Sequence, residues 1–160
     1  MPRPSWEALA DQTSDSHLLL LAYAIQNLGV LFQQQGRLID ATTRFMLAKD
    51  IYERLGRSHE LAGVLSNLSN VLRETGDLSR AEEAVRKAIN VFEILGLEQE
   101  VSRSKLSLSS VLIKSGQFYA AQRELMDARS VFSKLAQDVE VATVDLYRAV
   151  KAESLISVHE

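Results

Sequence analysis

Cysteine is absent from the 160-residue sequence, and proline occurs only twice, at Pro2 and Pro4. Without cysteine the chain forms no disulfide and offers no thiol as a nucleophile or metal ligand. Small secreted domains usually depend on disulfides, so this absence favours a reducing compartment, and we expect a cytoplasmic protein. Because proline is the strongest helix breaker, its absence after position 4 leaves every later segment free to be helical.

Long apolar runs and basic tracts are also missing. The longest apolar run, LLLLAYAI from Leu18 to Ile25, is far shorter than the roughly 20 residues that span a bilayer. The formal net charge is -3, and the lysines and arginines are interspersed with acids. We therefore expect neither a membrane segment nor direct binding of nucleic acid. Apolar residues nonetheless make up 46% of the chain, which is enough for the core of one folded domain.

Patterns typical of catalysis or metal binding are missing as well. The three histidines, His17, His59 and His159, are never paired at the i, i+4 spacing of a helical zinc site. The seven glycines are isolated, so there is no glycine-rich phosphate loop. Glu82 and Glu83 are adjacent, and neighbouring residues on a helix point apart, which prevents joint acid and base catalysis. We expect no enzymatic activity, no cofactor and no metal site.

What the sequence does contain is a repeat with a period of 40 residues. Small, aromatic and leucine positions all align when the sequence is shifted by this period. The aligned sets are Gly36, Gly76 and Gly116; Ala41, Ala81 and Ala121; Ala48, Ala88 and Ala128; Tyr52, Phe92 and Phe132; and Leu55, Leu95 and Leu135. A fixed period in this range is typical of repeat architectures.

Each repeat predicts two antiparallel helices. Apolar residues from Leu61 to Leu72 recur at spacings of three and four, which predicts a helix from Ser58 to about Thr75. A second helix follows Gly76 and ends at Gly96, its expected C-terminal cap. Strand signals are lacking. The predicted fold class is therefore all-α: a right-handed superhelical solenoid of three antiparallel helix pairs plus a C-terminal capping helix.

The expected organisation is an N-terminal segment, residues 1–16, which could include a short helix, and a single repeat domain, residues 17–157. The repeats cover about 17–56, 57–96 and 97–136, and the capping helix covers about 138–157. In that last helix, Asp145, Arg148 and Lys151 replace residues that are mostly apolar in the earlier repeats. We interpret these three residues as the polar, solvent-exposed face of a terminal helix.

The recurring residues resemble the tetratricopeptide repeat. The positions that carry the resemblance in the second unit are Leu68, Ser69, Leu72, Gly76, Ala81, Val85 and Ala88, and the first unit also has the pair Leu28 and Gly29. The resemblance covers about Leu21 to Ala136. The period of 40 and endings such as YERLG and FEILG are similar to the extended repeats of bacterial multidomain regulators and kinesin light chains. HEAT and armadillo repeats have comparable periods but lack this Gly-then-Ala spacing.

The resemblance implies a protein-interaction scaffold that holds a peptide or helix of a partner protein in a concave groove. The first helix of each pair should line the groove, where amides and hydroxyls can bond to a peptide backbone. Apolar residues at its C-terminal end could anchor partner side chains. The residues that we expect to bind a partner are Tyr23, Asn27, Gln34, Asn67, Asn70, Arg73, Arg103, Leu106, Ser110, Tyr147 and Val150.

Other interpretations of these residues stay open. Asn27 and Asn67 are equally well explained as solvated helix residues, and Tyr147 as a residue that packs on the preceding helix pair. Chaperone-binding repeats hold a C-terminal carboxylate with a set of lysine, arginine and asparagine residues. Only Asn67 and Arg103 resemble that set here, so we do not expect this binding mode.

Self-association is the alternative function. Leu18, Leu19 and Leu20 form an apolar cluster, and Trp6 precedes it. If Trp6 does not cover this cluster, the exposed patch marks a homodimer contact or a missing upstream segment. The chain would then be a structural or sensor module of a larger regulatory complex.

Overall fold

A computed structural model describes residue 7, residues 14–134 and residues 138–156, with side chains described for residue 7, residues 14–134 and residues 141–151. These residues form seven helices and no strand. The helices are α2 (Asp15–Gln34), α3 (Leu38–Arg54), α4 (Ser58–Thr75), α5 (Leu78–Ile94), α6 (Glu98–Lys114), α7 (Phe118–Lys134) and α8 (Asp138–Ile156). The predicted all-α class is confirmed, and α4 has the predicted bounds.

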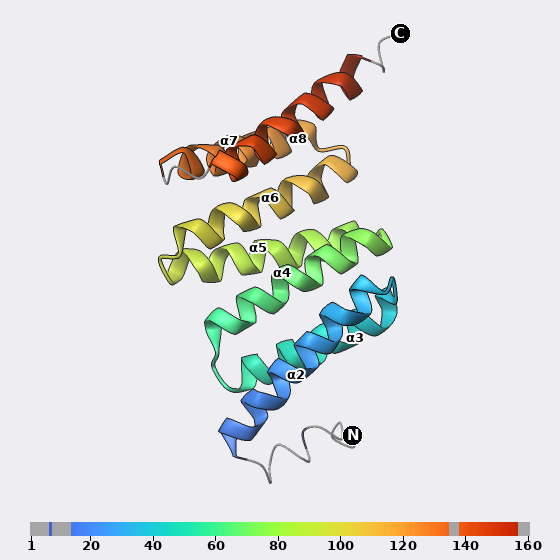
Figure 1. Cartoon of the computed structure of the whole chain (residues 1–160), viewed down its shortest axis with the longest axis vertical. Helices are drawn as coiled ribbons and strands as arrows, with labels where there is room; N and C mark the ends of the chain where they lie inside the picture. The colour runs from blue at the N-terminus through green and yellow to red at the C-terminus, as the bar shows by residue number, and fades with distance from the viewer. Residues whose placement is uncertain (1–6, 8–13, 135–137, 157–160) are drawn as a thin grey trace.

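The helices stack in antiparallel pairs along one axis (Figure 1). Each first helix packs most extensively against the second helix of its own pair: α2 against α3, α4 against α5, and α6 against α7. The second helix of each pair then packs against the first helix of the next pair, and α8 packs against α7. The result is the layered arrangement of a repeat solenoid, in which each layer contacts its neighbours.

A left-handed glycine ends the first helix of the second repeat. Gly76 has φ of 87° and is the C-terminal cap of α4. The N–H of Asp77 donates to Leu72 O at 2.9 Å, and the N–H of Gly76 donates to Arg73 O at 3.3 Å, so carbonyls at the helix end are satisfied. A side chain at Gly76 would be strained at this φ, which explains why glycine recurs at the repeat turns.

The repeated alanines lie where paired helices approach closely. Ala41, Ala81 and Ala121, which follow the turns, are fully buried. A single methyl group lets the backbones come together, and the larger buried side chains of Tyr52 and Phe132 fill the space between layers. The core is therefore a column of small and large residues that runs through the whole stack.

The prediction for Lys151 is wrong. At the equivalent repeat position, Val71 belongs to a core cluster that includes Phe45 of α3, so this position faces the preceding repeat and not solvent. Lys151 is accordingly only 8% exposed, and its Nζ donates to Phe118 O at 3.0 Å. The register therefore places this lysine inside the stack, where the second and third repeats have valine.

Asp145 and Arg148 do lie at the surface of α8, as predicted for a terminal helix. The carboxylate of Asp145 accepts a hydrogen bond from Arg129 Nε at 2.9 Å and lies 3.8 Å from Arg148. The polar face of α8 is thus narrower than the sequence suggested, because it includes two of the three expected residues.

Helix α2 is the one described helix long and apolar enough, by length and composition, to resemble a membrane span. Its apolar residues lie on two faces. One face, which includes Leu18, Ala22 and Ile25, is buried in the core shared with α3. The other face, which includes Leu20 and Leu28, is exposed at the N-terminal end of the stack. The second apolar face accounts for the high hydropathy of α2 in comparison with the helices inside the stack.

Candidate functional site

The first helices of the pairs line the inside of the curved stack. Contacts of α4 with α2 and with α6 are more extensive than the contacts between successive second helices, so the first helices lie closer together. Hydrogen bonds also cross between them: Gln33 Nε2 donates to Glu74 Oε1 at 2.7 Å, and Lys114 Nζ donates to Arg73 O at 3.4 Å. We call the surface formed by α2, α4, α6 and α8 the inner face.

Tyr23, an expected partner-binding residue, is occupied within the protein. Its hydroxyl donates to Glu60 Oε1 at 2.9 Å, and its ring packs edge to face on Tyr52 with centroids 6.0 Å apart. Burial disfavours ionisation of Glu60, but hydrogen bonds from Arg57, from its own backbone N–H and from Tyr23 outweigh this and lower the pKa of the carboxyl. Tyr23 therefore links the first repeat to the second.

The expected amides lie along α2 and α4 with different exposure. Asn27 and Gln34 are exposed, whereas Asn67 and Asn70 are half-buried. Asn70 precedes Arg73 by three residues, so the two side chains share one side of α4. This arrangement offers hydrogen-bonding groups near Arg73.

Four of the expected residues meet in one cavity. A cavity of about 220 Å³ lies where α4, α6, α7 and α8 come together, and its lining is mainly apolar. We call it the end pocket, and it is lined by Arg73, Ser110, Ile113, Lys114, Phe118, Tyr147, Val150 and Lys151. Arg73, Ser110, Tyr147 and Val150 were expected to bind a partner, and they come from three helices that are far apart in sequence.

Four lining residues were not expected from the sequence to bind a partner: Ile113, Lys114, Phe118 and Lys151. Phe118 is the first residue of α7, and its carbonyl accepts the hydrogen bond from Lys151 Nζ. A signal for Lys151 did exist, because a lysine stands where the repeat otherwise has Val71 and Val111, both buried. A charged residue at a position that is otherwise buried and apolar is a signal of a candidate binding site.

Leu106 and Arg103 are not part of the end pocket. Leu106 is half-buried and packs against the core cluster formed by Leu125, Ala128, Phe132 and Val144. Its position on α6 directs it toward α7 and α8, so it stabilises the stack. Arg103 is exposed near the opposite end of α6 and has an interaction partner.

The N-terminal leucine cluster divides between core and surface. Leu18 is buried and Leu19 is half-buried, so the expectation that both offer a surface to a second copy is wrong for Leu18. Leu20 is 65% exposed. Trp6 lies outside the described residues.

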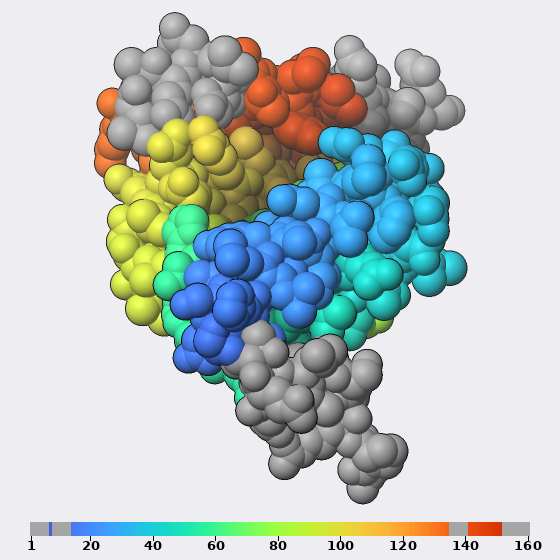
Figure 2. Space-filling model, turned by 60° about the horizontal axis from the view of Figure 1, so that its bottom comes forward, coloured from blue at the N-terminus to red at the C-terminus, as the bar shows by residue number. Residues whose placement is uncertain are grey.

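A larger apolar surface lies at the N-terminal end of the stack, where α2 crosses the face seen in Figure 2. We call this surface the α2 end face; it consists of Leu20, Leu21, Ala24, Leu28 and Leu31, all exposed. In α4 and α6 the equivalents of the last two, Leu68, Val71, Leu108 and Val111, are buried within the stack. The α2 end face is therefore the surface that a preceding helix covers in the later repeats.

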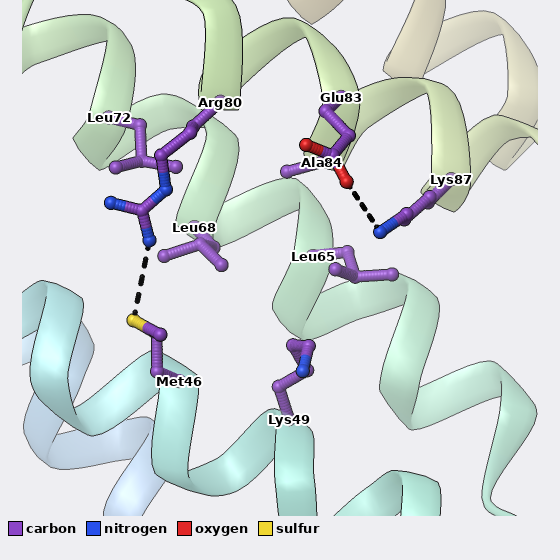
Figure 3. A pocket seen from close by; sticks show the side chains of 9 residues that line it. All are labelled: Met46, Lys49, Leu65, Leu68, Leu72, Arg80, Glu83, Ala84 and Lys87. Atoms are coloured by element: carbon purple, nitrogen blue, oxygen red, sulfur yellow. Dashed lines mark hydrogen bonds and ion pairs between the residues drawn. The ribbon is translucent and has the colours of Figure 1, made fainter. Parts of the chain in front are cut away.

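A second, shallower pocket of about 120 Å³ lies between α3 and α5 on the outside of the stack (Figure 3). Leu65, Leu68 and Leu72 of α4 form its floor and are at most 5% exposed. Its charged rim is satisfied internally, since Lys87 Nζ bonds to Glu83 Oε1 at 2.7 Å and Lys49 Nζ bonds to Asp50 Oδ1 at 3.0 Å. The charged groups at the rim of this pocket are thus paired within the protein, and they do not indicate a ligand.

The described residues contain no group of three or more histidines and carboxylates that could hold a metal ion. His17 contacts Ser14 Oγ through Nδ1 at 2.8 Å, and His59 packs edge to face against Phe92. His17 thus has a partner at the start of its own helix, and His59 contacts the neighbouring helix α5.

Comparison with known proteins identifies the repeat. The family model described as tetratricopeptide repeat matches residues 20–94. The crystal structure of BtubC (BKLC) from P. vanneervenii is similar over 86% of this chain and 65% of that chain, with a TM-score of 0.62 and 17% sequence identity. This chain thus spans 65% of the length of the BtubC chain, and the likeness concerns the fold. No curated protein matches the sequence. Residues 20–94 thus match the tetratricopeptide repeat family, and the stacked helix pairs have a fold similar to that of BtubC.

Proposed function

We propose that this protein binds a segment of a partner protein along its inner face, with the end pocket as the anchoring site. Tetratricopeptide repeats generally mediate interactions between proteins, and they form a non-catalytic class of repeat. The observation that supports this proposal is the end pocket, where apolar walls and polar groups from α4, α6 and α8 converge. Apolar anchors in pockets usually dominate the binding energy of such interfaces.

The amides beside the pocket complete the proposed surface. Asn67 and Asn70 lie on α4 before Arg73, and Ser110 lines the pocket from α6. Asparagine both donates and accepts hydrogen bonds, so it can bond to the N–H and C=O groups of an extended backbone. An extended or helical segment that enters between these groups would place one side chain in the end pocket.

The test is selection of peptides from a displayed random library, followed by affinity measurements on three proteins. These are the wild type, the inner-face variant Asn70→Ala/Tyr147→Ala, and the outer-face control Lys87→Ala/Met126→Ala, each with unchanged helicity. We expect selected peptides to bind the wild type and the control equally and the inner-face variant at least ten-fold more weakly. Equal binding to all three proteins, or no enriched peptide, would overturn the proposal.

Self-association through the α2 end face is a second candidate function. The supporting observation is that Leu28 and Leu31 are more than 40% exposed, although their equivalents in the next two repeats are buried. From Ser16 to Gln35, α2 and its cap contain no lysine, arginine, aspartate or glutamate. Two copies of α2 related by a twofold axis would thus meet without like-charge repulsion.

The mass in solution tests this second candidate. We expect light scattering to show a dimer at micromolar concentrations and a monomer for Leu28→Glu/Leu31→Glu, because the twofold axis would bring the new charges together. The control Ile39→Glu changes a residue that is 82% exposed on α3 and should leave the dimer intact. A wild type that stays monomeric at every concentration would exclude self-association through this face.

A further inference from the structure

The end pocket has an excess of positive charge. Three of its eight lining residues are cations, Arg73, Lys114 and Lys151, and none is an aspartate or glutamate. The walls between these cations are formed by Ile113, Phe118, Tyr147 and Val150. A mainly apolar cavity with three cations and no lining acid favours an anion attached to an apolar group.

Lys151 is the most buried of the three cations. It is 8% exposed, and its Nζ donates to two neutral acceptors, Phe118 O at 3.0 Å and Gln122 Oε1 at 3.2 Å. The ammonium also lies 5.9 Å from the ring centroid of Phe118 and 5.7 Å from that of Tyr119. An ammonium has three protons to donate, and burying it without an opposite charge is unfavourable. Lys151 therefore favours a nearby anion.

Arg73 and Lys114 are also without a carboxylate partner among the described residues. The Nε of Arg73 is buried and makes no hydrogen bond there. Lys114 Nζ donates to the carbonyl of Arg73 at 3.4 Å, which is long for such a bond. Both side chains thus retain donors for a further acceptor.

Other half-buried lysines of this chain do have carboxylate partners. Lys105 lies 3.0 Å from Asp127 and 3.8 Å from Glu124. Lys49 lies 3.0 Å from Asp50 and 3.4 Å from Glu53; burial lowers the pKa of Lys49, but these two carboxylates together outweigh it and raise the pKa. The end pocket departs from this pattern at Lys151, which is buried, and at Arg73, which is half-buried, and the exposed Lys114 lies beside them. Because the fold neutralises its half-buried lysines internally, an external anion is the natural partner of these cations.

We infer that the end pocket receives an acidic residue of the partner segment together with a neighbouring aliphatic or aromatic residue. The inference rests on the proposed binding of a protein segment at the inner face. The carboxylate would lie near Arg73, Lys114 and Lys151, and the apolar side chain would pack against the walls. About 220 Å³ holds one or two side chains, whereas pockets for whole small ligands usually measure about 300–1,000 Å³.

Continuity with the inner face favours a protein segment over a free amphiphilic acid. Ser110 lines the pocket and lies on the same side of α6 as the inner face, and Asn70 lies one turn before Arg73 on α4. These groups can form hydrogen bonds with the peptide backbone on either side of the acidic residue, whereas a free amphiphilic acid has no backbone amides to bond with them.

The test uses the displayed library described above and two further probes. We expect the selected peptides to be enriched in aspartate or glutamate next to leucine, isoleucine or phenylalanine. Changing that glutamate to glutamine in a selected peptide should weaken binding by about ten-fold, because a charge-assisted hydrogen bond is lost. The variant Lys114→Glu, changed at an exposed position, should remove the enrichment in acidic residues, because the new carboxylate competes for the two remaining cations.

The outcomes separate this inference from the proposed function. If the selected peptides are neutral and bind the wild type but not the inner-face variant, the inference of an acidic ligand is overturned and the proposed function is supported. If no peptide is selected, both the inference and the proposed function are overturned. Titration with octanoate tests whether a free amphiphilic acid is the ligand. If octanoate binds saturably and Lys114→Glu abolishes this binding, while the affinity for the selected peptides is unchanged by Lys114→Glu, the ligand of the pocket is a small amphiphile. That result would overturn the inference.

Discussion

Gly29 in α2 and Ser69 in α4 stand at the same position of the first and second repeats, yet they meet different neighbours. A Cβ atom added at Gly29 would lie 2.7 Å from Cε1 of Phe45, which is closer than packed atoms come. In the second repeat Val85 replaces Phe45, and the smaller side chain leaves room for Ser69, whose hydroxyl donates to Ala81 O at 2.8 Å. The two repeats thus keep the same backbone arrangement, because a smaller residue on the first helix is matched by a larger one on the second, and the reverse.

The first helices of the same two repeats also differ in burial, because a preceding helix pair packs against α4 but not against α2 among the described residues. Leu68 of α4 is 5% exposed, because it packs in the core cluster that includes α3, whereas its equivalent Leu28 is 42% exposed. Buried aromatic residues differ as well, since Tyr52 in the first repeat corresponds to Phe92 in the second. Equal positions in a repeat protein therefore carry unequal energies, and their neighbours set the difference.

The largest expected difference separates Leu68→Ala from Leu28→Ala. Truncating the buried leucine should lower the free energy of unfolding by about 2–4 kcal/mol, and truncating the exposed one by less than about 1 kcal/mol. Urea unfolding at a concentration that keeps the protein monomeric would measure both. Equal losses would break the comparison and indicate that Leu28 is covered in solution.

The next largest effects are expected for Gly29→Ala and Gly63→Ala, which should change the free energy of unfolding in opposite directions. The first change forces a methyl group against Phe45 and should cost about 1–2 kcal/mol, even after the gain in helix propensity. Apart from its chain neighbours and the nearby backbone of α4 itself, no atom lies within 4 Å of a Cβ added at Gly63, so the second change should stabilise α4 by about 0.5–1 kcal/mol.

Thermal and urea unfolding would show whether the two glycine variants shift stability in opposite directions. The double variant Gly29→Ala/Phe45→Leu should lose less than the sum of its single changes, because the smaller side chain accepts the new methyl group. Strict additivity would mean that Phe45 is not the cause of the cost at Gly29.

The smallest effect at neutral pH is expected for Tyr52→Phe, which gives the first repeat the aromatic residue of the second. The change removes the hydrogen bond from Tyr52 Oη to Gln26 Oε1, 2.8 Å long, and should cost about 1 kcal/mol. Urea unfolding at pH 7 measures this loss.

Alkaline pH sharpens the same test. Burial, with smaller contributions from Tyr23 and Glu60, raises the pKa of Tyr52 to about 12 from the ordinary value of 10.0. The folded chain therefore keeps a proton that the unfolded chain releases, so the stability from this group is full below pH 10 and is lost as pH rises toward 12. The loss amounts to about 3 kcal/mol, and the Phe variant should escape it. Parallel declines of both proteins between pH 10 and pH 12 would contradict the assignment.

Much of the fold could be predicted from local pattern. The bounds of α4 followed from apolar spacing and Gly76, because helix periodicity and a left-handed cap are properties of a few neighbouring residues. The end pocket could be predicted only in part. Arg73, Ser110, Tyr147 and Val150 were expected on the inner face, but their convergence with Phe118 depends on how α8 packs against α7.

The burial of single residues was beyond the same reasoning. Leu18 and Leu20 are two residues apart in one leucine run, yet one is in the core and the other is 65% exposed. Tyr23 was expected to face a partner; it is 38% exposed, and its hydroxyl also bonds to Glu60 of the next repeat, which the sequence did not predict. Both outcomes depend on the direction from which the next helix approaches, which a single helix pattern does not contain.

By itself the sequence determined the helices, their turns and their 40-residue repeat, because each of these depends on interactions within a helix or between a helix and its adjoining turn. Only the tertiary structure decided which faces are covered, so it alone placed Leu18 in the core and left Leu28 exposed at the end of the stack. The physical reason is that desolvation and pairing of a side chain depend on neighbours about 30–40 residues away in the chain, whose positions are set by the packing of whole layers.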